Sequence, residues 1–190
     1  MDHIRVLIAD DQPIFRRGVA QSLMDTEGIK DVIEMCPVTL LNRVEALSTL
    51  SVDVLIYGNM SRGLTSLIVP WVVLKQQPNM KVIVVGSAVD DDDLLNALTL
   101  GISAYVPRHS SLDELLGTVR TVANGSNPIF HEVLTRPELA LHVVDLYRLM
   151  VSTEEVEETP RTASVHLSCR EVEVLEYAAD SYSNKQIGDM

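Results

Sequence analysis

The stretch Val52-Asp-Val-Leu-Ile-Tyr-Gly-Asn-Met60 predicts a buried strand that runs directly into a loop. Its apolar run is short and begins with β-branched residues, and Gly58 and Asn59 end it. Strands that are apolar on both faces are typical of parallel sheets with helices on each side. The flanking sequence tests this prediction, because successive parallel strands need a long, usually helical, connection.

Apolar strand patterns alternate with amphipathic helix patterns over most of the chain. Five strands are predicted at His3–Ala9, Asp31–Met35, Val52–Tyr57, Lys81–Val85 and Ile102–Val106. Five helices are predicted at Ile14–Glu27, Val38–Leu50, Leu67–Gln77, Asp90–Leu100 and Ser111–Asn124, the last opened by the capping box Ser111-Leu112-Asp113-Glu114. This alternation predicts an α/β fold with a five-stranded parallel, doubly wound sheet.

Sheets of this kind bind ligands beyond the carboxyl ends of their strands. Four of these ends carry distinctive residues, namely Asp10-Asp11, Gly58-Asn59, Gly86-Ser87 and Pro107-Arg108. We expect these residues to converge in space although they are spread over the sequence.

The composition excludes several classes of protein. A net charge of −12 gives no support for a nucleic-acid-binding or anionic-membrane-binding surface. The two cysteines, Cys36 and Cys169, have no nearby partner, so neither zinc nor a disulfide is predicted, and core packing is expected. No signal peptide is recognised, and the longest apolar run, Leu67–Leu74, is too short to span a membrane. A cytoplasmic protein without membrane contacts is expected.

The alternation of strand and helix patterns ends at Gly125. Pro137–Met150 predicts a helix, and residues 152–163 contain four glutamates and Pro160, which is typical of a solvated linker. Leu167–Val172 then forms a complete helix start, and Ser183–Gln186 is a second capping box. These boundaries predict a first domain at 1–126, a connecting helix and acidic linker at 127–166, and an all-α segment at 167–190.

Two sequence motifs resemble a known family. Asp10-Asp11-Gln12-Pro13 followed by Ile14-Phe15-Arg16-Arg17-Gly18 resembles the opening of the receiver domain in NarL/FixJ-type two-component response regulators. Leu167-Ser-Cys-Arg-Glu171 and the later Ser183-Asn-Lys-Gln-Ile187 resemble the start of a LuxR-type helix-turn-helix. The two matches cover about residues 3–125 and 166–190. The resemblance implies a flavodoxin-like receiver, a role in transcription control, a sensor kinase or regulatory protein as partner, and a homodimer.

In that family an acidic pair and a strand-three aspartate hold Mg²⁺, and the aspartate takes a phosphoryl group from a kinase. Asp10 and Asp11 match the metal-binding pair, whereas Gly58 stands at the phosphoacceptor position. Neither neighbour of Gly58, Tyr57 or Asn59, is a carboxylate. The resemblance therefore predicts a receiver that cannot be phosphorylated at this position.

The family's other switch residues are also altered. Gly86 falls at the position of the switch hydroxyl, with Ser87 one residue later. Tyr105 matches a frequent aromatic of strand five, and Arg108 replaces a lysine with a bulkier, forked cation. An enzymatic alternative, a phosphatase, is disfavoured because such enzymes need Asp-x-Asp and here Asp10 and Asp11 are adjacent.

Several interpretations stay open at this level. Asp10 and Asp11 either bind a metal or cap the first helix, and Arg108 either pairs with one of them or is solvated. The run Asp90–Asp93 is interpreted as a solvated helix start, with a metal site as the weaker alternative. The apolar run Leu67–Leu74 is either core or a partner surface. The apolar stripe Leu139–Met150 either packs on its own receiver or forms an interdomain or dimer helix.

The DNA-binding prediction is limited by the end of the sequence. In the LuxR-type module the recognition helix follows the segment that begins near Ile187, and this chain stops at Met190. Arg170 and Lys185 are the candidate DNA contacts, to the phosphate backbone only. DNA binding is therefore expected in a full-length form only, and the alternative is a receiver-based interaction module that does not bind DNA.

Overall fold

The computed structural model describes residues 4–58, 67–86 and 90–144. The predictions made for Cys169, Arg170, Lys185 and Ser87, and for the segment 167–190 as a whole, lie outside these residues.

A five-stranded parallel sheet forms the centre of the structure. Its strands are β1 (Ile4–Ala9), β2 (Ile29–Met35), β3 (Val54–Gly58), β4 (Lys81–Gly86) and β5 (Ala104–Pro107). The strand order is β2-β1-β3-β4-β5, and every neighbouring pair is parallel. This is the flavodoxin-like order, so the predicted fold class is confirmed.

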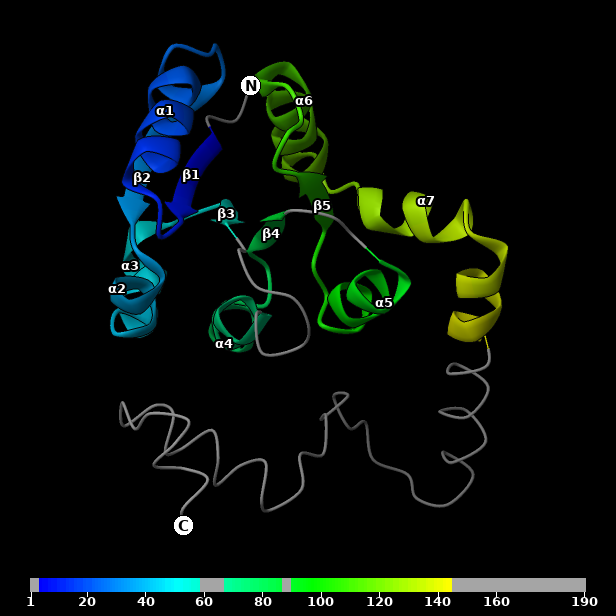
Figure 1. Ribbon diagram of the computed structural model, residues 1–190. Coiled ribbons are helices and arrows are strands. Elements are labelled where there is room, and N and C mark those ends of the chain that lie inside the picture. Colours follow the sequence, from blue (N-terminus) through cyan, green and yellow to red (C-terminus); the bar gives the residue numbers. More distant parts are fainter. Residues whose placement is uncertain (1–3, 59–66, 87–89, 145–190) are drawn as a thin grey trace. The chain divides into compact units, whose positions relative to one another are not determined.

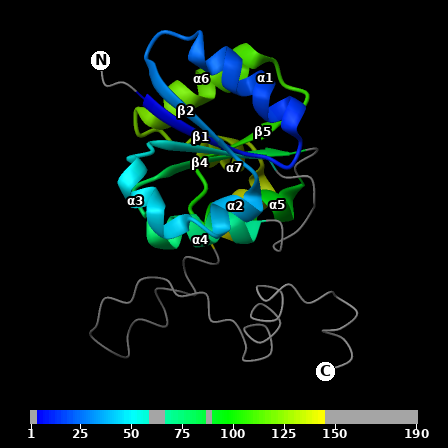
Figure 2. The same cartoon turned by 90° about the vertical axis from the view of Figure 1, so that its left-hand side faces the viewer.

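Helices cover both faces of the sheet (Figures 1 and 2). One face carries α1 (Pro13–Met24) and α6 (Leu112–Ala123). The other face carries α2 (Pro37–Leu41), α3 (Leu47–Leu50), α4 (Ile68–Gln76) and α5 (Asp91–Thr99). A further helix, α7 (Pro128–Leu134), lies beside β5 and α5, as Figure 1 shows.

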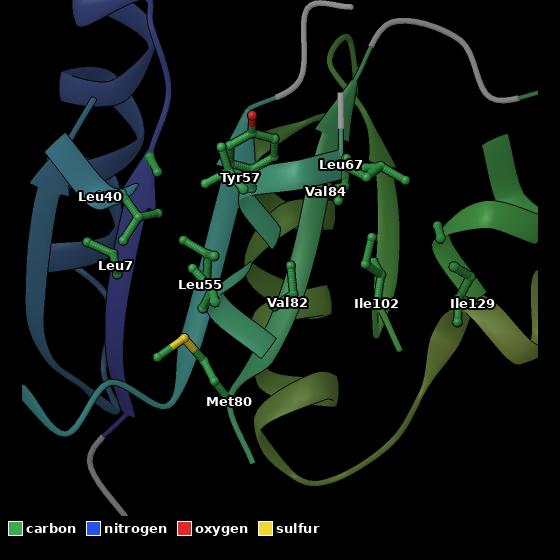
Figure 3. Close-up of a cluster of buried hydrophobic side chains, with 14 of the residues drawn as sticks. Leu7, Leu40, Leu55, Tyr57, Leu67, Met80, Val82, Val84, Ile102 and Ile129 are labelled. Carbon is green, nitrogen blue, oxygen red and sulfur yellow. The ribbon is translucent and has the colours of Figure 1, made fainter. Parts of the chain in front are cut away.

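Each face of the sheet has its own hydrophobic core, because alternate side chains of a strand point to opposite faces. On the α1–α6 face, Val6, Ile8 and Ile56 pack with Val19 and Val119. On the opposite face, Leu7, Leu55 and Val82 form a row across three strands, Leu40 lies beside Leu7, and Ile129 belongs to the same cluster but lies beyond Ile102 (Figure 3). We call this second set the lower core cluster.

The prediction of one continuous helix over Val38–Leu50 is wrong. It consists of α2, a 3-10 turn at Val44–Ala46 and α3. Asn42 is a poor former of helix interiors, and Arg43 has φ −126° and ψ 15°, outside the helical region. Leu40 and Leu47 are both buried, so the broken segment still contributes to the lower core cluster.

The described segment after α6, residues 128–144, packs against the core of the sheet. Residues 137–144 are helical, within the predicted helix Pro137–Met150, whereas α7 is not anticipated by the sequence patterns. Ile129, Val133 and Leu139 are buried in the lower core cluster, and the Ile129 N–H donates to the Ser103 carbonyl at 3.1 Å. Of the two interpretations of this helix, its described part fits packing on its own receiver.

Three further features concern the apolar run Leu67–Leu74, the core packing expected for Cys36, and the membrane spans. Within Leu67–Leu74, Val69 and Val73 are buried whereas Trp71 is half-buried, with the Lys75 ammonium 4.5 Å from its ring centre. Cys36 is only partly buried, with its Sγ 3.0 Å from the Thr39 hydroxyl. Among the described helices, none has the length and apolar character that a membrane span requires.

Candidate functional site

The carboxyl ends of four strands converge, as the sequence predicts. Asp10 follows β1, Gly58 ends β3, Gly86 ends β4, and Arg108 follows β5. The Arg108 N–H donates to the Gly86 carbonyl at 2.6 Å, and the Arg108 side chain reaches Asp10. This group of residues forms the candidate site.

Asp10 is a fully buried carboxylate with both oxygens engaged. Its Oδ1 accepts the backbone N–H of Gln12, the residue just before α1, at 2.6 Å. Its Oδ2 lies 2.9 Å from Nη1 of Arg108, and their side chains are 0% and 17% exposed. The two atoms form a close ion pair, but their alignment does not meet the geometry of a hydrogen bond. Of the two alternatives left open for Arg108, pairing with the acidic pair is the one present, and Asp10 is its partner.

Arg108 also contacts the loop between β1 and α1. Its Nη2 donates to the Gln12 Oε1 at 2.9 Å, and its guanidinium carbon lies 4.0 Å from the centre of the Phe15 ring. A planar guanidinium suits this combination, because it donates through its edge while its face stacks on an aromatic ring. Arg108 thus fastens the end of β5 to the start of α1.

Gly58 leaves room for the Asp10 carboxylate. Ala9 pairs with Tyr57 across β1 and β3, so Asp10 and Gly58 are the next cross-strand neighbours. A β-carbon built on Gly58 would lie 1.6 Å from Oδ2 and 2.4 Å from Cγ of Asp10. Any side chain at position 58 would therefore overlap with Asp10 in its present position.

Gly86 has the same relation to Tyr105. A β-carbon built on Gly86 would lie 1.8 Å from the Tyr105 hydroxyl oxygen. At both glycines, a side chain from another strand occupies the space beside the α-carbon.

The other acidic residue of the pair has a different environment. Asp11 is exposed, whereas the neighbouring Tyr57 is buried. Burial, followed by the negative charges of Asp11 and Asp10, raises the pKa of Tyr57 to about 12. The Asp10 carbonyl accepts a hydrogen bond from Arg16 Nη1 at 2.6 Å, so a second arginine also holds this loop.

The residues present do not fit the divalent cation that the resemblance implies. Mg²⁺ needs free oxygen ligands in an octahedral arrangement, and both Asp10 oxygens already have partners, one of them a cation. In the part of the chain that the structure describes, no group of three or more His, Cys, Asp and Glu side chains is placed to hold a metal.

Sequence analysis missed two members of the site, Gln12 and Phe15. Gln12 is 96 residues away from Arg108 in the sequence and Phe15 is 93 residues away, so no local sequence pattern could predict their contacts with it. Pro13, which opens α1, was the available signal, because it sets where the loop ends and therefore which residues face β5.

Comparisons with known proteins identify the relatives of this chain. No protein-family model matches it. It is 26% identical over 194 residues to the transcriptional regulatory protein DegU of Brevibacillus brevis, a match that covers 98% of this chain and 79% of DegU. It is 25% identical over 185 residues to the response regulator protein VraR of Staphylococcus saprophyticus, covering 97% of this chain and 79% of VraR.

The homologues of this chain are response regulators of the NarL and DegU type.

A solved structure agrees with this response-regulator homology at the level of the fold. The RcsB response regulator of Salmonella typhimurium superposes with a TM-score of 0.56 and 21% identity, over 100% of this chain and 83% of RcsB. The sheet order is therefore that of a receiver-domain fold.

Proposed function

We propose that this response-regulator homologue acts in transcription control with a receiver that does not use an aspartyl phosphate. The observation that supports the proposal is the Asp10 carboxylate, which fills the space beside Gly58 while paired with Arg108. Glycine has no carboxylate, so position 58 cannot form an acyl phosphate.

The arrangement of Arg108 supports the same proposal. Its guanidinium places a positive charge 2.9 Å from the carboxylate that would otherwise bind a cation. A divalent cation at Asp10 would have to displace this charge, together with the Gln12 and Phe15 contacts that hold it. Asp10 and Arg108 therefore act as a permanent internal ion pair.

The output of such a receiver depends on protein contacts rather than on phosphoryl transfer. The role in transcription control is inferred from the similarity to DegU, a transcriptional regulatory protein. DNA and a second copy of the chain remain the proposed partners, and a sensor kinase would then act through binding alone.

A phosphorylation assay tests the proposal. The chain is incubated with acetyl phosphate and Mg²⁺, and its intact mass is compared with that of VraR treated in parallel. We expect no phosphoryl adduct on this chain under conditions that modify the relative. A stoichiometric adduct that hydroxylamine removes would overturn the proposal, because hydroxylamine lability is the signature of an acyl phosphate.

A further inference from the structure

Residues 128–144 cover one edge of the sheet. β5 is an edge strand, because it stands last in the strand order. An open edge strand exposes unpaired backbone groups to which another chain can bind. Here α7 contacts β5, α5 and α6, and Figure 1 shows it beside the first two. The Ile129 N–H donates to the carbonyl of Ser103, the residue just before β5, at 3.1 Å, so a backbone group at this edge has its partner in α7.

Apolar side chains at helical spacing attach this cover to the core. Ile129 and Val133 are four residues apart on α7, and Leu139 and Val143 are four residues apart on the helix that follows. Residues at this spacing share one face of a helix. The first three are buried in the lower core cluster, and the partly buried Val143 packs against it. Both helices after α6 therefore present an apolar face to the core.

Arg136 joins the same segment to α5. It lies between α7 and the next helix, and its Nη1 pairs with Asp91, the first residue of α5. Its Nη2 lies 3.2 Å from Oε1 of Glu132 on α7. Ala97 of α5 is buried in the same cluster as Val133. A charge pair at the start of α5 and a shared apolar cluster thus connect α5 to α7.

We infer that residues 128–144 form an intramolecular strap, which holds α5 in place and closes the β5 edge to a second copy of the chain. The apolar face attaches the strap, and the Arg136–Asp91 pair fastens it to the start of α5. A strand added by a partner would then have to use β2, the other edge strand of the described sheet.

Amide hydrogen exchange, followed by NMR on the isotope-labelled full chain, tests whether the strap is closed. The Ile129 amide is the direct reporter, because its hydrogen bond to Ser103 exists only while α7 lies on the β5 edge. We expect it to exchange as slowly as the amides of β1, which lies inside the sheet. Exchange at the rate of an exposed amide would overturn the inference.

Arg136→Ala tests the fastening to α5. We expect exchange at Ile129 and in α5 to become about two- to fivefold faster relative to β1, the range for a partly exposed ion pair. Asp91→Ala should have the same effect, and the double variant should add little to either, because both remove one interaction.

The matched control is Arg17→Ala. It breaks another exposed ion pair, with Glu34, on the α1 side of the sheet. This variant should leave the ratio of Ile129 exchange to β1 exchange unchanged. If Arg136→Ala also leaves the ratio unchanged, Arg136 does not fasten the strap and the inference falls.

Sedimentation tests whether the strap excludes a second copy. Val133→Asp places a charge in the lower core cluster and should release the strap, whereas Leu134→Asp places the same charge at a side chain that is 70% exposed. We expect a higher average mass for Val133→Asp than for the wild type and Leu134→Asp at equal concentration. An unchanged mass in a folded Val133→Asp protein would overturn the closure of the edge.

A milder variant covers a folding failure of Val133→Asp. Arg136→Glu leaves the apolar face intact but faces the start of α5 and Glu132 with a like charge. Its average mass should also rise above that of the wild type, by a smaller amount. No rise in this folded variant would equally reject the closure.

The strap and the proposed function fail separately. Uptake of a phosphoryl group by a chain whose Ile129 amide exchanges slowly would leave the strap standing and reject the proposed function. Fast exchange at Ile129 in a chain that takes up no phosphoryl group would do the reverse.

Discussion

A buried carboxylate and a partly buried guanidinium decide the chemistry of the candidate site. Asp10 has no exposed surface, and Arg108, which follows the end of β5, compensates its charge. A buried carboxylate without a partner is strongly destabilising, so the two residues depend on each other. This dependence and the fit of Asp10 beside Gly58 lead to two predictions for single residues, and the raised pKa of Tyr57 leads to a third.

Gly58→Ala should lower the free energy of unfolding by about 1–3 kcal/mol, because its methyl group overlaps with the Asp10 carboxylate. Urea denaturation measures the change. The control is Gly117→Ala, in an open position of α6, which should raise stability by roughly 0.5–1 kcal/mol through helix propensity. Equal effects at the two glycines would refute the overlap with Asp10.

Arg108→Ala should lower the free energy of unfolding by about 3–5 kcal/mol, because Asp10 is left buried without its counter-charge. The control is Arg17→Ala, which breaks a pair with Glu34 at 2.6 Å on an arginine side chain that is 73% exposed. That loss should stay below about 1 kcal/mol, since solvent screens exposed pairs. Similar losses of stability in the two variants would show that the Asp10–Arg108 pair contributes no more than a solvent-exposed ion pair does.

Tyr57 should make the protein sensitive to alkali. Its pKa is raised to about 12, against roughly 10 in an unfolded chain, so the folded state holds the proton more tightly. The stabilisation is complete below pH ~10 and is lost as the pH rises to about 12, a difference of roughly 2–3 kcal/mol. The free energy of unfolding, followed from pH 9 to 12, should therefore fall more steeply in the wild type than in Tyr57→Phe. Parallel curves would mean that the tyrosine ionises normally.

At the level of single elements, α6 has the best-defined start in the structure. Ser111 Oγ accepts the Glu114 N–H at 3.2 Å, and Glu114 Oε2 accepts the Ser111 N–H at 2.8 Å. This capping box confirms the sequence prediction and satisfies two helix-terminal donors at once. Elements with such a local code need no tertiary contact to specify where they begin.

Ser111→Ala should destabilise the protein by about 0.5–2 kcal/mol, because the amide of Glu114 loses its acceptor. Thermal and urea denaturation measure the change. The control is Ser126→Ala, at an exposed serine beyond the end of α6, which should be nearly neutral. A neutral Ser111→Ala would mean that tertiary packing alone defines the start of α6.

At the level of the whole molecule, the described residues after α6, 128–144, are attached to the core. Arg136 Nη2 lies 3.2 Å from Glu132 Oε1, and its Nη1 pairs with Asp91 at the start of α5. The hydrogen bond to Asp91 is the main cause of a raised pKa of Arg136. The buried side chain of Leu139 completes the attachment, so α7 and residues 137–144 should unfold together with the sheet.

Leu139→Ala should cost about 2–5 kcal/mol while unfolding keeps a single transition, because this leucine is 4% exposed in the lower core cluster. Leu141→Ala is the matched control on the same helix, 65% exposed, and should change stability by less than about 0.5 kcal/mol. Equal costs, or a separate early transition in Leu139→Ala, would show that the helix at 137–144 is not part of the core.

The sequence by itself determined the sheet and most of its connections. Uniformly apolar runs such as the one ending at Gly58 specify buried parallel strands, and the Ser111 box specifies a helix start, because both signals are local. It also determined which residues stand at the strand ends and that these ends would converge, but it left open whether Arg108 pairs with the acidic residues. The sequence did not predict that the helix Val38–Leu50 is interrupted at Asn42. Helix propensity is a weak signal, and tertiary packing decides whether a residue such as Asn42 interrupts a helix.

Only the tertiary structure decided which side chains fill the space beside Gly58 and Gly86. That Asp10 fills the space beside Gly58, that Tyr105 lies over Gly86, and that Gln12 and Phe15 hold Arg108 are contacts between distant parts of the chain. A missing side chain leaves a volume, and the neighbours that fill it are chosen by the register of the strands and by the rotamers that the packed core permits.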